Sequence, residues 1–148
     1  MDKKVSAGKM LSPGKLAGII FCILAGICTV VLLFMDVYFS GQMKVIDKCF
    51  KSVARGDYNG TVSCLSEWGA HGLTEDNFEE ETEWIRQLID GDEVKTSVTF
   101  VERRICGDAY CVYFDLTVYN DDDHITEEVE ADIILKDMKW IIDDFTWL

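Results

Sequence analysis

The sequence predicts an α+β protein in which one membrane-spanning helix precedes a small domain of about three helices packed on a mostly antiparallel, four-stranded sheet. Three observations lead to this fold class. Residues 16–35 form an apolar block without a charge. From Met43 to Ile89 the apolar residues recur at helical spacing, and beyond Glu93 they alternate with polar residues. Helices that come first, followed by a run of strands, are typical of an α+β domain.

The apolar block has the length of a membrane span. Its 20 residues, at about 1.5 Å of rise each, cover roughly the 30 Å hydrocarbon core of a bilayer. A cleaved signal peptide would have a shorter apolar core of about 7–15 residues and a small-x-small cleavage site. The exit sequence, residues 36–41, lacks such a site. We therefore expect a retained single-pass anchor embedded in membrane lipid.

Charge predicts the orientation of the anchor. The tail, residues 1–15, carries four lysines and one acid, Asp2. Basic flanks stay on the cytoplasmic side, although Lys44, Lys48 and Lys51 on the other side weaken this bias. We expect a cytoplasmic tail, a span over 16–35, a stalk over 36–42 and an extracytoplasmic domain over 43–148 at the cell membrane.

The part beyond the span is strongly acidic. Residues 36–148 hold 10 basic and 26 acidic residues, a net charge of −16. Such a domain repels nucleic acid and anionic surfaces, so no nucleic-acid partner is expected. His71 and His124 have no ligand at metal spacing. The acidic run 120–123 is explained by a turn better than by a calcium loop. No metal or cofactor is predicted.

Local patterns place the elements of the domain. The first helix runs from Met43 to a stop at Gly56, the second covers 58–68, and the third starts at the Asn77 cap. Four alternating runs follow, separated by turns at 107–109, 120–123 and 137–138. Each run has one apolar face, as expected for a meander that packs against helices.

Four cysteines lie in the domain. Cys106 and Cys111 flank a four-residue loop, so they face each other across a hairpin at a distance that suits a disulfide. Cys49 and Cys64 lie on consecutive helices whose antiparallel packing would bring them together. The alternative is that all four are small apolar core residues. We favour the two bridges.

Small residues also recur in the span. Gly18, Cys22 and Gly26 follow one another every four residues, a spacing that lets two membrane helices approach closely. This face predicts a homodimer. Glycine is common in membrane helices in any case, so the pattern has an ordinary explanation as well.

Three phrases resemble the nuclear transport factor 2-like superfamily, whose cone fold wraps a curved sheet around helices. Residues 50–58 are similar to its first helix and Gly-Asp-Tyr exit. Residues 107–112 are similar to its "Gly-Asp-x-Ala-x-Val" hairpin with one residue missing. Residues 139–143 are similar to its closing "Trp-Lys-Ile" strand, with Ile141 in place of the lysine.

The resemblance covers 43–148 and is greatest to uncharacterised, membrane-tethered bacterial members. It implies a cone-shaped domain. The anchor-plus-cone layout also resembles the bitopic scaffold subunit of type IV secretion and conjugation machines. This second similarity is one of layout, because one fold hosts many functions.

The resemblance also implies a place to look for catalysis, since enzymes of the superfamily use carboxylates, Tyr and His inside the cone. Tyr113, Asp115 and Tyr119 share one face of a strand, where Asp would take a proton and Tyr would polarise an oxyanion. Their parity is opposite to the apolar residues of the same strand, so a solvated face is the better interpretation. No catalytic residue is assigned.

We therefore predict a non-enzymatic, membrane-anchored binding domain with an unknown protein partner or a small apolar ligand. An aromatic interior would hold an apolar ligand; the predicted lining residues are Trp68, Trp84, Phe114 and Trp140. A specific form of the hypothesis is an accessory scaffold of an envelope assembly. The alternative is a small isomerase- or hydrolase-like enzyme that uses Asp115 with Tyr113 or Tyr119.

Overall fold

The computed structural model describes residues 13–89 and 93–148. It consists of two compact units that meet between Tyr38 and Phe39, and each unit is described by itself. Of the predicted basic tail, residues 1–12 lie outside the described part of the chain.

One long helix, α1 (Pro13–Ala54), contains the predicted span. Its apolar segment has a mean hydropathy of 2.8 and buries none of its surface. By length and composition it is therefore able to cross a membrane. The predicted stalk over 36–42 is not a separate segment, because α1 continues through it. The folded unit already begins at Phe39, and Gln42 is fully buried.

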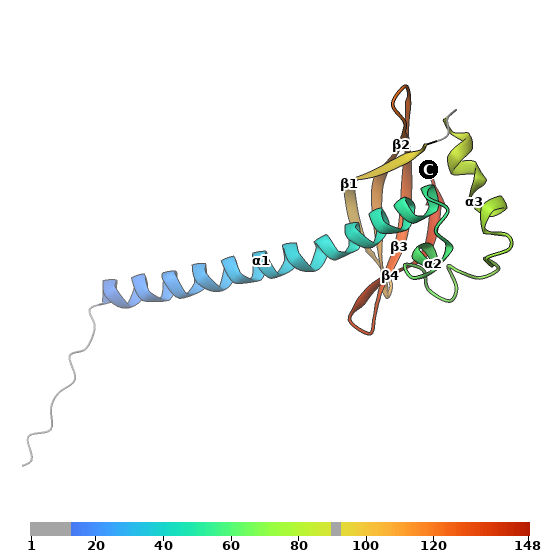
Figure 1. Ribbon diagram of the computed structural model, residues 1–148. Coiled ribbons are helices and arrows are strands. Elements are labelled where there is room, and N and C mark those ends of the chain that lie inside the picture. The colour runs from blue at the N-terminus through green and yellow to red at the C-terminus, as the bar shows by residue number, and fades with distance from the viewer. Residues whose placement is uncertain (1–12, 90–92) are drawn as a thin grey trace, which may run out of the picture. The chain divides into compact units, whose positions relative to one another are not determined.

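The second unit is an α+β domain, as the sequence predicted. The end of α1 is followed by α2 (Tyr58–Val62) and α3 (Phe78–Gln87), and then by four strands. The strands β1 (Lys95–Cys106), β2 (Ala109–Tyr119), β3 (His124–Lys136) and β4 (Lys139–Trp147) pair in chain order, each antiparallel to the next. The β1/β2 and β3/β4 turns therefore lie at one end of the sheet and the β2/β3 turn at the other (Figure 1).

The core lies between the C-terminal part of α1 and the apolar face of the sheet. Strand β2 alternates as predicted: its even-numbered residues from Val112 to Val118 are at most 1% exposed. Phe50 of α1 packs against two aromatic rings, with centroids 5.8 Å from Phe114 and 5.1 Å from Phe145. Burial of such rings contributes a large part of the hydrophobic stabilisation of a small domain.

Helix ends follow the sequence signals in two places and depart from them in a third. Gly56 adopts a φ of +70° just past the end of α1, a conformation that suits glycine. Asp57 caps α2 through a hydrogen bond from the Gly60 amide. At α3, Asn77 occupies the cap position but its side chain accepts from the Thr74 amide instead.

The second helix is shorter than predicted. It ends at Val62, whereas the pattern extended it to Trp68. The reason is tertiary: the Ser66 amide donates to the Ile142 carbonyl and the Ile142 amide donates to the Cys64 carbonyl, both at 2.8 Å. Strand β4 thus takes the backbone groups that a longer helix would use.

Candidate functional site: a basic pocket beside strand β1

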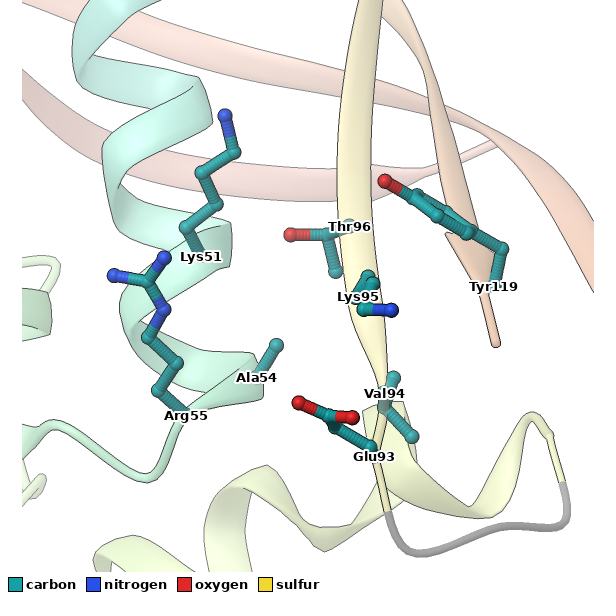
Figure 2. Close-up of a pocket in the computed structure, with 8 residues that line it drawn as sticks. All are labelled: Lys51, Ala54, Arg55, Glu93, Val94, Lys95, Thr96 and Tyr119. Carbon is teal, nitrogen blue, oxygen red and sulfur yellow. The ribbon is translucent and has the colours of Figure 1, made fainter. Parts of the chain in front are cut away.

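A pocket of about 580 Å³ lies where the end of α1 meets the start of β1. Helix α1 contributes Lys51, Ala54 and Arg55, strand β1 contributes Lys95 and Thr96, and Tyr119 is the last residue of β2. The segment before β1 adds Glu93 and Val94. Figure 2 shows how the side chains from the helix and the strand frame this space.

Three of the lining residues are cationic, which contrasts with the acidity of the domain. Lys51 forms an exposed ion pair of 2.7 Å with Asp47, and Lys95 forms one of 3.4 Å with Asp121. Surface pairs of this kind contribute only about 0–1 kcal/mol each, so a ligand can replace them at little cost. Among the described residues of the lining, Glu93 is the one carboxylate. Since Asp47 and Asp121 pair with the two lysines, Arg55 is the lining cation without an ion pair in the described part of the chain.

Thr96 gives the pocket a polar group without a partner. Its side chain is 3% exposed, and its hydroxyl has no hydrogen-bond partner among the residues that the structure describes. In Figure 2 this hydroxyl is directed from β1 toward α1. A buried hydroxyl without a partner costs roughly 1–3 kcal/mol. A ligand atom that accepts a hydrogen bond from Thr96 would remove this cost.

The residues predicted from the cysteine pattern are found in two different states. Cys106 and Cys111 are joined by a disulfide across the β1/β2 hairpin, with their Cα atoms 5.9 Å apart. The Glu130 carboxylate lies within 4.8 Å of both sulfurs. Because the two cysteines are bonded to each other, they do not offer thiolate ligands to a metal.

The second predicted bridge, between Cys49 and Cys64, is not formed in the structure. Both residues are buried free thiols, at 2% and 1% exposure, and they interact directly. The hydrogen bond from the Cys49 thiol, supported by Ser63 and Lys48, lowers the pKa of Cys64 to about 6, whereas the same contact and burial raise the pKa of Cys49. The Cys64 thiol also donates to the Gly60 carbonyl at 3.3 Å. Cys64 lies two residues beyond the end of α2, so the two cysteines are close together as predicted, but not on two helices and not as a disulfide.

The aromatic residues predicted to line an apolar pocket are not brought together. Phe114 is 1% exposed within the filled core, whereas Trp68 is 70% exposed and stacks on His71. Trp84 contacts Trp147, and Trp140 packs against Tyr110. These four side chains do not share one lining in the structure, because the number of aromatic residues in a sequence does not tell which of them the tertiary fold brings together.

The residues of the enzyme hypothesis lie on the outer face of the sheet. Tyr113, Asp115 and Tyr119 alternate with the buried residues of β2 and are half-exposed. Asp115 is paired with Thr99 on one side and Glu128 on the other. Of the three, Tyr119 reaches the basic pocket, and Tyr113 lies beside Glu130 and Arg104. They do not form one convergent site.

The small residues of the span are exposed along α1. Gly18 and Gly26 have open space where a side chain would begin, and Cys22 is exposed as well. A close helix–helix contact through this face stays a prediction.

The outer face of the sheet also gives a prediction on stability. Burial, followed by the charges of Glu130, Asp144 and Asp143, raises the pKa of Asp132 above 3.8. The folded protein thus binds this proton more tightly than the unfolded chain. Ionisation therefore destabilises the fold, fully above the raised pKa and not at all below 3.8. We expect Asp132→Asn to raise the thermal unfolding midpoint at neutral pH and to leave it unchanged well below 3.8.

The control for this prediction is Asp122→Asn in the β2/β3 turn, which is exposed and should change little at either pH. Thermal unfolding followed by circular dichroism at the two pH values measures both variants. Equal shifts in the two variants, or a gain for Asp132→Asn that persists in acid, would contradict the assignment.

The pocket itself was not predicted from the sequence. Lys51 appeared on the polar face of a helix, and Thr96 was grouped with Val94, Val98 and Phe100 on the apolar side of an alternating run. Helix and strand are separated by some 40 residues of chain, so their proximity is a tertiary fact. One signal was present: Lys51, Arg55 and Lys95 are three of the 10 basic residues among the 26 acidic ones beyond residue 35.

No family model matches the sequence, and no curated protein matches it. Solved structures do. A protein of unknown function from Shewanella oneidensis, described as NTF2-like, is 13% identical, with 74% of this chain and 97% of that chain covered and a TM-score of 0.49. A protein of unknown function from Mycobacterium tuberculosis is 13% identical, with 84% and 74% covered and a TM-score of 0.48. A putative NTF2-like transpeptidase from Campylobacter jejuni is 15% identical, with 68% and 95% covered and a TM-score of 0.43.

At such identities a likeness concerns the fold alone. The long apolar helix, the short helices and the antiparallel sheet of four strands agree with the resemblance that the sequence phrases indicated. In fold, this chain resembles the NTF2-like proteins.

Proposed function

We propose that this protein is a membrane-anchored, extracytoplasmic domain that binds a small anionic ligand, a carboxylate or a phosphate, in the basic pocket beside β1. The observation that carries this proposal is the pairing of three cations with the unpartnered Thr96 hydroxyl in one cavity. The apolar ligand expected from the aromatic residues is replaced by an anionic one, because the pocket that is present has a charged lining.

Each group of the pocket has a role in this proposal. The Arg55 side chain makes no hydrogen bond within the described part of the chain, and its planar guanidinium suits a carboxylate or phosphate. Thr96 and Tyr119 add hydroxyl donors from the floor and the rim. The net charge of −16 beyond the span opposes nonspecific binding of anions to the surface of the domain.

The extracytoplasmic location rests on two observations. The basic tail favours a cytoplasmic N-terminus, and the Cys106–Cys111 disulfide is the kind of bond that persists outside the reducing cytoplasm. A role as an accessory scaffold of an envelope assembly is compatible with this arrangement, with the pocket as the ligand-responsive part of the subunit.

Calorimetric titration of the full chain in detergent micelles tests the proposal, with inorganic phosphate and succinate as probes. We expect at least one probe to bind. Arg55→Gln should weaken it by roughly tenfold to hundredfold, since a hydrogen bond to a charged group contributes about 1.5–3 kcal/mol.

The matched control is Lys44→Gln, which removes an exposed charge from the same helix outside the pocket and should leave the affinity unchanged. Failure of both probes to bind, or equal loss in Arg55→Gln and Lys44→Gln, would show that the pocket is not an anion site.

A further inference from the structure

One end of the domain is held close to the membrane by chain length alone. Met35 is the last residue of the apolar block, and Phe39, four residues later, is the first residue of the folded unit. Four residues span at most about 14 Å. Whatever lies around Phe39 in the domain is therefore near the bilayer surface.

The neighbours of Phe39 belong to the ends of two hairpins. The Phe39 ring lies 6.0 Å from that of Tyr110, which in turn lies 5.6 Å from that of Trp140. Tyr110 is the second residue of β2 and Trp140 the second residue of β4. Because the β1/β2 and β3/β4 turns lie at the same end of the sheet (Figure 1), both hairpin tips are at the membrane-proximal end of the domain.

These tips expose apolar side chains. Ile105 at the β1/β2 tip is 78% exposed, and Met138 at the β3/β4 tip is 90% exposed. Leu135, at 42%, lies beside Trp140 in the same hairpin. The opposite end of the sheet is different in character, because its β2/β3 turn consists of Asn120 and three aspartates. Along β2 the two ends are about 30 Å apart.

The β3/β4 tip is unfavourable in water in three respects. Lys136 and Lys139 are paired directly across the hairpin, where like charges repel. The exposed Glu67 carboxylate lies 3.9 Å from Lys136, a surface pair of the kind that contributes only about 0–1 kcal/mol. Met138 adopts a positive φ of 62° next to Asp137 at 50°, a conformation that is uncommon for residues other than glycine, asparagine and aspartate. Met138 is also almost fully solvent-exposed. Such costs persist where a local conformation serves a function.

We infer that the two hairpin tips dock on the bilayer that carries the anchor, with Ile105 and Met138 in the boundary between headgroups and acyl chains and Lys136 and Lys139 on anionic headgroups. A lipid phosphate between the two lysines removes their repulsion, and lysine stems reach from an apolar layer to a polar one. Tyr110 and Trp140 stand where aromatic residues collect at membrane interfaces. This inference does not depend on the anion-binding pocket, which lies at the other end of β1.

Tryptophan probes test the docking in the full chain reconstituted in nanodiscs that contain anionic lipids. Ile105→Trp and Met138→Trp place a reporter at each tip, and Asp122→Trp places one in the opposite turn. Since interfacial side chains lie roughly 5–10 Å into the headgroup–acyl boundary, the added emission of the two tip probes should be blue-shifted and quenched by lipids brominated near the headgroup. The Asp122→Trp emission should be that of a water-exposed indole.

The predicted contact between the two lysines and anionic headgroups is tested by a triple variant that combines Lys136→Glu and Lys139→Glu with the Met138→Trp probe. We expect loss of the blue shift and of the quenching, and the same loss for the unaltered lysines when anionic lipid is omitted. Cooperative unfolding of each variant verifies the fold. The inference would be overturned if the tip probes gave the same emission and quenching as Asp122→Trp. It would also be overturned if quenching of the tip probes stayed the same after both lysines were replaced and after anionic lipid was omitted.

Discussion

Phe50→Ala is expected to lower the free energy of unfolding of the domain by about 3–5 kcal/mol, the cost of removing a well-packed core aromatic. The Phe50 side chain is 3% exposed and joins α1 to both Phe114 of β2 and Phe145 of β4. Its removal leaves a cavity that strand and helix backbones cannot close without breaking their own hydrogen bonds. Small domains are stable by about 5–15 kcal/mol, so a large part of the stability would be lost.

Urea unfolding of the full chain in detergent, followed by tryptophan fluorescence, measures this change. Phe100→Ala is the matched control, because the same side chain is removed at a position that is 45% exposed, and its effect should be much smaller. If both variants were destabilised equally, the central place of Phe50 in the core would be incorrect.

Thr96→Val is expected to act in opposite directions on stability and on binding. Without ligand, the valine should raise the free energy of unfolding by about 1–3 kcal/mol, because a buried hydroxyl without a partner is replaced by an apolar group of similar shape. In the calorimetric titration it should weaken anion binding, because the donor is gone. A protein that keeps a destabilising hydroxyl in a cavity is expected to use it there.

Thr82→Val provides the comparison for the stability half of this prediction. Thr82 is also buried, at 6% exposure, but its hydroxyl donates to the Phe78 carbonyl at 2.6 Å. Its replacement should lower the stability. A loss of stability in Thr96→Val, or unchanged probe affinity, would show that the Thr96 hydroxyl is satisfied or has no part in binding.

Local sequence patterns were sufficient to predict most of the helices and strands and the fold class. Alternation in 109–119 identified a strand and its buried face, which the structure confirms, because a pleated strand sends successive side chains to opposite sides. The same rule placed Thr96 on the apolar side of its run, where it is buried. It could not show the pocket around Thr96, because the neighbouring side chains come from a helix 40 residues earlier.

Contiguous stretches of sequence were enough to predict a helix long and apolar enough to cross a membrane, the α+β order of the domain, its acidity and the cysteines that face each other across a hairpin. These depend on length, period and charge, which are properties of contiguous residues. The three-dimensional fold was needed to show that α1 runs unbroken into the domain, that β4 shortens the second helix, and that Lys51, Arg55 and Thr96 share one cavity. It also placed both hairpin tips beside Phe39. The physical reason is that such contacts join residues far apart in the chain, and their energies depend on packing that no local window contains.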